Sequence, residues 1–173
     1  LESQGRVAYS CCVDKTVRPT TAQHDYVHSL HKVYAYNLSA TEKNAISYYK
    51  SSGYHSMNNT LRQGKSTPAI DAMASAILLA PELEDEVVVT RTWGSSSNRL
   101  AKLKTGDVFE DKGFVSTSLN VKPVTVTGGS SKDELNIMNI RLPPGTRGLY
   151  VGAGPKIGGE GEYLLPPGSK FKI

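Results

Sequence analysis

The stretch Gly158-Gly159-Glu160-Gly161-Glu162-Tyr163-Leu164-Leu165-Pro166 places two glutamates one residue apart, where a glycine-rich loop meets an apolar run. Residues 163–165 are typical of a buried strand, which Pro166-Pro167-Gly168 ends. If the strand includes residues 160–162, Glu160 and Glu162 point to the same face of the sheet, and Gly161 leaves room for another backbone or a ligand. Two carboxylates held together at the edge of a core repel each other and lose solvation, so the pair indicates a functional site. The alternative is a solvated strand end with both charges facing water.

The composition limits the class of protein. A chain of 173 residues fits one domain, residues 1–173, with a real core. Its 20 Lys+Arg and 16 Asp+Glu give a net charge of +4 without a run of like charge, which argues against nucleic-acid binding but suits an anionic small ligand. Cys11 and Cys12 are adjacent, which excludes a disulfide framework. No apolar run approaches the length of a membrane span. Because the chain begins at Leu1 rather than Met, we expect a processed piece or an excised domain.

The first half of the chain carries helix signals. Ser39-Ala40-Thr41-Glu42 is a capping box, and Thr67-Pro68 combines a cap residue with a proline in the first turn. Gly53, Gly64 and Pro81 are expected to end helices. We expect an irregular segment over residues 1–23, followed by helices over about residues 25–36, 39–50, 54–62 and 67–80.

Three histidines lie on or beside the first expected helix. His24, His28 and His31 are spaced so that they can share one face. Two histidines four residues apart are a known metal-binding spacing, but no carboxylate or thiolate ligand is obvious nearby. We therefore predict structural or exposed histidines and no metal site.

The second half of the chain carries strand signals, over residues 87–93, 113–119, 135–142, 148–151, 160–165 and 169–173. Helices followed by strands predict an α+β fold. Arg91, at the far end of a buried strand, needs an anion from the protein or from a ligand, and its planar fork suits a phosphate. Ser116, Thr117 and Ser118 end the second strand with three hydroxyls, which either fix neighbouring groups or form an ordinary strand edge.

The order of these motifs resembles a known enzyme class. Arg91, then Ser116-Thr117-Ser118, then Glu160-Gly161-Glu162 follow one another as in the arginine–serine–glutamate class of mono-ADP-ribosyltransferases, which includes bacterial toxins and phage enzymes. The likeness runs from about Ser39 to the end of the chain. It implies an ADP-ribosyltransferase-like fold, with N-terminal helices followed by two packed, mainly antiparallel β-sheets around a cleft for the substrate NAD.

The resemblance also implies roles for individual residues. Glu162 corresponds to the catalytic glutamate, Ser116 to the serine that orients it, and Arg91 to the arginine that holds the NAD phosphates. Glu160 corresponds to the residue that prepares the acceptor, and a glutamate at that position implies an arginine acceptor. Further contacts with NAD are expected from Thr92, Thr117, Tyr49, Tyr54, Asn58 and Arg62. Residues 120–134 would cover the nicotinamide, and residues 152–159 would contact the target.

The residue types suit this chemistry. Cleavage of the N-glycosidic bond of NAD leaves positive charge on the ribose, which a fixed carboxylate stabilises. A second carboxylate can accept the proton of an attacking guanidinium. We therefore expect an arginine-specific mono-ADP-ribosyltransferase that is monomeric, secreted or injected, and active in a host cytoplasm on a protein such as actin. No nucleic-acid or membrane partner is expected.

The sequence leaves other functions open. An NAD glycohydrolase would cleave the same bond without a protein acceptor. A non-enzymatic binding domain of the same fold is disfavoured, because Arg91, Ser116, Glu160 and Glu162 are all present. A glycosidase would also pair two carboxylates, but the chain has only 1 Trp and no obvious platform for stacking a sugar.

Overall fold

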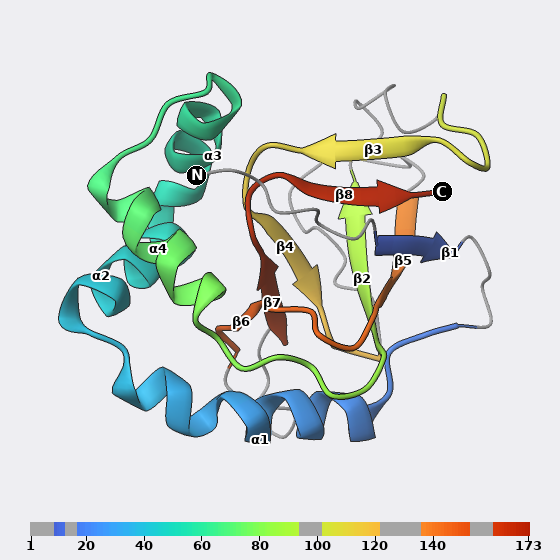
Figure 1. The fold of residues 1–173 in the computed structure, drawn as a ribbon, viewed down its shortest axis with the longest axis horizontal. Coiled ribbons are helices and arrows are strands. Elements are labelled where there is room, and N and C mark those ends of the chain that lie inside the picture. The colour runs from blue at the N-terminus through green and yellow to red at the C-terminus, as the bar shows by residue number, and fades with distance from the viewer. Residues whose placement is uncertain (1–8, 13–16, 94–101, 122–135, 153–160) are drawn as a thin grey trace, which may run out of the picture.

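The computed structural model describes residues 9–12, 17–93, 102–121, 136–152 and 161–173 (Figure 1). Its helical elements are α1 (Thr21–Asn37), α2 (Ala40–Tyr48), the π-helix η1 (Tyr49–Gly53), α3 (Tyr54–Arg62) and α4 (Pro68–Leu78). Its strands are β1 (Tyr9–Cys12), β2 (Val87–Trp93), β3 (Val108–Asp111), β4 (Val115–Ser118), β5 (Asn136–Leu142), β6 (Leu149–Tyr150), β7 (Glu162–Leu165) and β8 (Ser169–Lys172). The predicted α+β order, helices before most strands, is confirmed.

The strands are hydrogen-bonded in the order β3-β8-β1-β5-β2-β4-β7-β6. In Figure 1, β3, β8 and β1 cross the direction of β5, β2, β4 and β7, so two groups of strands meet where β1 pairs with β5. The pairing is mainly antiparallel as predicted; β1 and β8 are a parallel pair. Both groups contribute side chains to one core, which includes Phe109 and Phe171 from the first group and Val89, Ile140 and Leu165 from the second.

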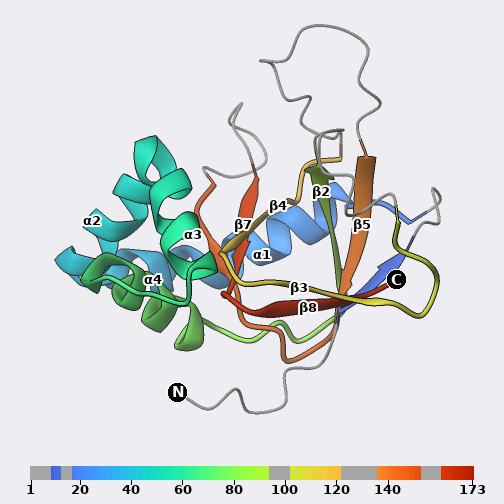
Figure 2. The same cartoon turned by 90° about the horizontal axis from the view of Figure 1, so that it is seen from above.

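The helices gather on one side of the strands. Figure 2 shows α2, α3 and α4 as a group beside β7 and β4, while α1 runs past the same strands. A second core joins this group to the sheet through apolar residues that are almost completely buried, including Met73, Ile77, Phe114 and Leu164. No helix in the described parts of the chain is long and apolar enough to cross a membrane.

The capping signals act as predicted. The Glu42 amide donates to Ser39 Oγ at 3.2 Å, and the Ser39 amide donates to Glu42 Oε2 at 2.8 Å, which completes the capping box of α2. At the start of α4, the Ile70 amide donates to Thr67 Oγ1 at 3.2 Å. Gly64 follows α3 with φ 75°, the left-handed conformation expected after a helix.

Gly53 does not end a helix, contrary to the prediction. It has φ −78° and ψ −16°, and the chain continues through η1 directly into α3. A Cβ at this position would lie 2.4 Å from the ring of Tyr48, a half-exposed side chain that would have to shift to admit it. The φ of Gly53 is not in the left-handed range of a glycine that ends a helix, so the helix end predicted at Gly53 was wrong.

Two strands were not predicted. β1 lies within residues 1–23, which were expected to be irregular, and β3 lies in a stretch without clear alternation of apolar and polar residues. β1 pairs with β5 and β8, and β3 pairs with β8, so both depend on partners distant in sequence. Local pattern alone therefore carried little signal for either strand.

The buried histidines of α1 have structural contacts, in agreement with the sequence prediction. Nε2 of His24 lies 2.8 Å from Tyr150 Oη, and the two ring nitrogens of His31 lie 3.0 Å from the carbonyl oxygens of Val27 and Gly148. Among the described residues, no group of three or more His, Cys, Asp or Glu side chains could hold a metal ion.

Candidate active site

A cavity of about 530 Å³ lies where η1 and α3 face strands β2, β4 and β7. Most of the residues expected to bind substrate line it: Tyr49, Tyr54, Asn58, Arg91, Thr92, Ser116, Thr117 and Glu162. Arg62 is not among the lining residues, and Glu160 lies outside the described residues. The fold thus brings together positions that are far apart in the chain.

Glu162 and Ser116 form the centre of this site. Strands β4 and β7 are antiparallel, with Ser118 opposite Glu162 and Ser116 opposite Leu164. Ser116 Oγ donates a hydrogen bond of 2.7 Å to Glu162 Oε1. A hydrogen bond to a carboxylate is short and strongly directional, so it fixes the orientation of the Glu162 side chain at the cavity wall.

Thr117 has a different environment from its neighbours. Adjacent residues on a strand point to opposite faces, and the Thr117 side chain is buried. Its Oγ1 donates to the Tyr163 carbonyl oxygen at 2.6 Å. The hydroxyl therefore links β4 to β7, although atoms of Thr117 also reach the cavity wall.

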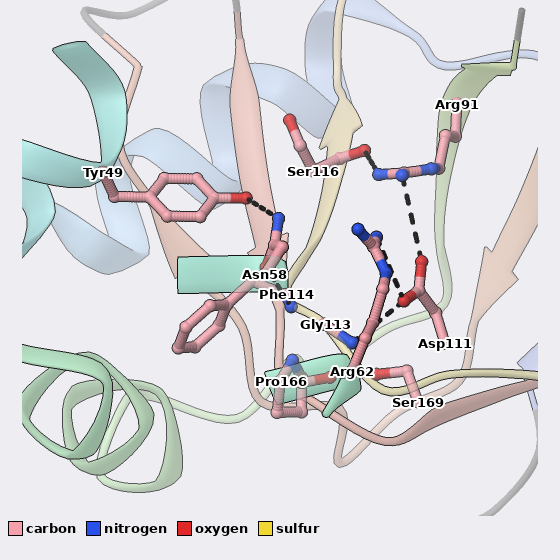
Figure 3. A network of polar contacts seen from close by, with 10 residues as sticks. All are labelled: Tyr49, Asn58, Arg62, Arg91, Asp111, Gly113, Phe114, Ser116, Pro166 and Ser169. Atoms are coloured by element: carbon pink, nitrogen blue, oxygen red, sulfur yellow. Dashed lines mark hydrogen bonds and ion pairs between the residues drawn. The ribbon is translucent and has the colours of Figure 1, made fainter. Parts of the chain in front are cut away.

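The Arg91 side chain contacts both strand β4 and the Asp111 carboxylate. Its Nη1 donates to the Ser116 carbonyl oxygen at 2.8 Å, and its Nη2 lies 3.9 Å from Asp111 Oδ2 (Figure 3). Burial lowers the pKa of Arg91, whereas the Asp111 carboxylate opposes this shift. The Asp111 carboxylate thus supplies one anion for this mostly buried arginine, and Arg91 still lines the cavity.

Asp111, the partner of the cavity-lining Arg91, was missed by sequence reasoning. It lies in Asp111-Lys112-Gly113, which has the composition of a turn, and its Oδ1 accepts the Gly113 amide at 2.9 Å, as aspartates in turns often do. Arg62, at the end of α3, also reaches Asp111 Oδ1, at 3.6 Å. Lys50 was missed as well: it lines the cavity, and its Nζ donates to the Val151 carbonyl oxygen at 2.7 Å.

The aromatic wall comes from η1 and α3. Tyr49 is buried and Tyr54 is half-exposed, with their ring centroids 6.4 Å apart at an interplanar angle of 67°. Burial raises the pKa of Tyr49, so its hydroxyl remains protonated near neutral pH. Asn58 links this wall to β4: its Oδ1 accepts the Phe114 amide at 2.9 Å and its Nδ2 donates to Tyr49 Oη at 3.4 Å (Figure 3). The Asn58 amide therefore positions the cavity wall, whatever it contributes to a ligand.

Gly161 packs against the side chains of His24 and Asn120, which occupy the space that the missing side chain leaves. A Cβ at this position would lie 2.5 Å from His24 Cε1 and 2.8 Å from Asn120 Oδ1. The Leu119 amide also donates to the Gly161 carbonyl oxygen at 2.8 Å. Strand β7, which carries Glu162, therefore packs directly against α1.

The expected nicotinamide and target loops fall mainly on residues 122–135 and 153–160, which are outside the described residues.

Comparisons with known proteins relate this chain to ADP-ribosyltransferases, the class that the order of the site residues resembles. Residues 23–173 match the family model described as ADP-ribosyltransferase exoenzyme. The chain is 27% identical over 146 residues to NAD(+)--arginine ADP-ribosyltransferase EFV of Enterococcus faecalis, which covers 79% of this chain and 29% of that protein. It therefore spans less than a third of the length of this curated relative.

Two solved structures show the same fold. The C3larvin toxin, an ADP-ribosyltransferase from Paenibacillus larvae, has a TM-score of 0.66 at 22% identity, over 87% of this chain and 85% of that one. BECa, an ADP-ribosylating toxin of a C. perfringens binary enterotoxin solved with NADH, has a TM-score of 0.72 at 19% identity, over 88% of this chain and 42% of that one. The predicted ADP-ribosyltransferase-like fold is confirmed.

Proposed function

We propose that this chain, which belongs to the ADP-ribosyltransferase exoenzyme family, transfers ADP-ribose from NAD to an arginine side chain and releases nicotinamide. The observation that carries the proposal is the contact between Ser116 Oγ and Glu162 Oε1, 2.7 Å, at the wall of a cavity that also holds Arg91. A carboxylate fixed in a substrate-sized cavity, beside a buried cation, suits a reaction in which a charged ligand develops positive charge.

Glu162 would stabilise the transition state. When the bond between nicotinamide and ribose breaks, positive charge develops on the ribose, and a carboxylate at the correct distance stabilises it electrostatically. The hydrogen bond from Ser116 holds that carboxylate in place before the substrate arrives. Such preorganisation is effective because no reorientation is needed during the reaction.

The cavity wall would hold the rest of NAD. Arg91 and Lys50 provide cationic groups suited to the two phosphates, and the half-exposed Tyr54 provides an aromatic surface for a ring. These residues come from β2, η1 and α3, so substrate binding would bridge the helical group and the sheet.

The arginine acceptor is supported by the curated relative named as an NAD(+)--arginine ADP-ribosyltransferase. In this proposal, Glu160 accepts a proton from the attacking guanidinium. The acceptor would be a host protein, with actin as the first candidate to test. We further propose that the protein acts as a monomer, is secreted or injected, and works in a host cytoplasm.

The experiment measures nicotinamide release from NAD, with and without agmatine as a soluble guanidinium, in the wild type, Glu162→Gln and Glu86→Gln. Glu162→Gln keeps the size of the side chain and an oxygen that Ser116 can bond, but removes the charge. We expect the rate to rise with agmatine and to fall on the order of 10²–10³-fold in Glu162→Gln. Glu86→Gln, which removes an exposed carboxylate paired with Arg141 at 2.8 Å, should behave as the wild type.

Each other outcome has a distinct meaning. Release that is indifferent to agmatine would replace the transferase by an NAD glycohydrolase or by an enzyme with another acceptor. Full activity of Glu162→Gln would remove Glu162 from the mechanism. The absence of release in the wild type would leave a binding domain of the same fold.

A further inference from the structure

Asp111 is a buried carboxylate that the reaction proposed above does not use. It ends β3, and only 5% of its side chain is exposed. Its Oδ2 lies 3.9 Å from Nη2 of Arg91 on β2, and its Oδ1 lies 3.6 Å from Nη2 of Arg62 on α3. In Figure 3 both arginine side chains point toward this one carboxylate.

Arg91 depends on this carboxylate more than Arg62 does, because 17% of the Arg91 side chain is exposed, against 48% for Arg62. Arg91 is mostly buried, which penalises its charged form, and the nearby charge of Arg62 lowers the pKa of Arg91 further. The Asp111 carboxylate acts in the opposite direction on the pKa of Arg91. Among the carboxylates that favour the charged form of Arg91, Asp111 contributes most and Glu162 less, so removal of Asp111 would leave the mostly buried cation less well compensated.

The position of Asp111 is fixed independently of the arginines. Its Oδ1 accepts the Gly113 amide at 2.9 Å, and its backbone carbonyl accepts the Gly168 amide at 2.8 Å. Residue 111 also pairs with Ser169 across β3 and β8. The carboxylate is therefore fixed at a corner of the sheet. The longer and more flexible side chain of Arg91 can be aligned against it.

The contacts lead from this corner to the catalytic carboxylate. Asp111 Oδ2 forms an ion pair with Nη2 of Arg91 at 3.9 Å, Nη1 of Arg91 donates to the Ser116 carbonyl oxygen at 2.8 Å, and Ser116 Oγ donates to Glu162 Oε1 at 2.7 Å. A shift of Arg91 would therefore be transmitted to the strand that orients Glu162. Displacements of about 1 Å are sufficient to reduce turnover strongly.

We propose that Asp111 is a positioning residue of this site, whose negative charge holds Arg91 against β4 and thereby keeps Ser116 and Glu162 aligned for cleavage of NAD. The inference rests on the proposed function. The contact of Arg62 with the same carboxylate also ties the end of α3 to the sheet.

The test compares Asp111→Asn with Asp111→Glu, with Glu86→Gln as a control that removes an exposed, arginine-paired carboxylate. kcat and KM for NAD are measured by nicotinamide release, and thermal unfolding defines a temperature at which every variant is folded. We expect kcat to fall on the order of tenfold or more in Asp111→Asn. Asp111→Glu should retain more activity, because it keeps the charge.

A role in shape alone predicts the reverse order, since asparagine has the size of aspartate and glutamate does not. The proposal is overturned if folded Asp111→Asn keeps the wild-type kcat, or if Asp111→Glu is the less active of the two variants.

A second readout does not depend on turnover. Rotation of the Arg91 guanidinium about its Nε–Cζ bond can be followed by NMR in the wild type and in Asp111→Asn. We expect hindered rotation in the wild type and faster rotation in the variant. If the wild type releases no nicotinamide, the proposed function fails, and unchanged rotation in Asp111→Asn would separately refute the role of Asp111.

Discussion

Replacing Gly161 with alanine would put a methyl group where the His24 ring already lies. The new Cβ would be 2.5 Å from Cε1 and 2.8 Å from Nε2 of His24, and 2.8 Å from Asn120 Oδ1. Contacts this short require a shift. His24 cannot move easily, because it is buried and its Nε2 lies 2.8 Å from Tyr150 Oη. The backbone at residue 161 must therefore move instead.

The size of the effect follows from this crowding. Overpacking a closed site costs about 1–3 kcal/mol, and loss of the hydrogen bond from the Leu119 amide to the Gly161 carbonyl would add about 1 kcal/mol. For a chain of this size, the combined loss of about 2–4 kcal/mol corresponds to a fall in Tm of roughly 4–16 °C. Since Gly161 directly precedes Glu162, we also expect turnover to fall on the order of 10²-fold as the carboxylate is displaced.

The assay is a double-mutant cycle on Tm and kcat, with Gly161→Ala, His24→Ala and the double variant. His24→Ala removes the ring that the methyl group would meet, so the double variant should recover part of both losses, with a coupling of about 1 kcal/mol or more. Gly145→Ala is the control: with φ 85° and open space around its Cβ, it should lower Tm through backbone strain without reducing kcat. The reasoning would be refuted if the losses of Tm and kcat in the double variant were additive, or if Gly161→Ala kept the Tm and kcat of the wild type.

Two further predictions concern stability. Burial lowers the pKa of His24 and His31 below the usual 6.5, so the unfolded chain binds their protons at higher pH, and the free energy of unfolding should fall as the pH drops below about 6.5. Chemical denaturation near neutral and near pH 5.5 should show a weaker pH dependence in His31→Asn; an unchanged slope would exclude His31 as a contributor. Ser39→Ala should cost about 1 kcal/mol by removing the Oγ that accepts the Glu42 amide, and leave kcat unchanged. An unchanged Tm, or a loss of kcat at full folding, would contradict this.

Much of the helical half could be predicted because its signals are local. The capping box at Ser39, the Thr67-Pro68 start and the glycine at residue 64 each act on groups a few residues away. The strand patterns of residues 87–93 and 163–165 were equally clear, because each carries apolar residues for a buried core.

The candidate site was predicted as a set of residues, but its contacts were not. The order of Arg91, Ser116 and Glu162 along the chain was sufficient to propose the chemistry. The partner of Arg91 could not be found in this way, because Asp111 lies in a turn-like stretch and on a strand with weak alternation. Only the pairing of β3 with β8 places its carboxylate beside the two arginines.

The sequence by itself therefore determined the class of fold, the capped helix starts and the residues that suggest a reaction, since these depend on local capping, periodicity and motif order. The tertiary structure decided which groups meet: Ser116 with Glu162, Asp111 with Arg91, and the His24 ring with Gly161. These contacts join elements far apart in the chain. They form because the crossing groups of strands and α1 enclose a common core, and no short window of sequence encodes such packing.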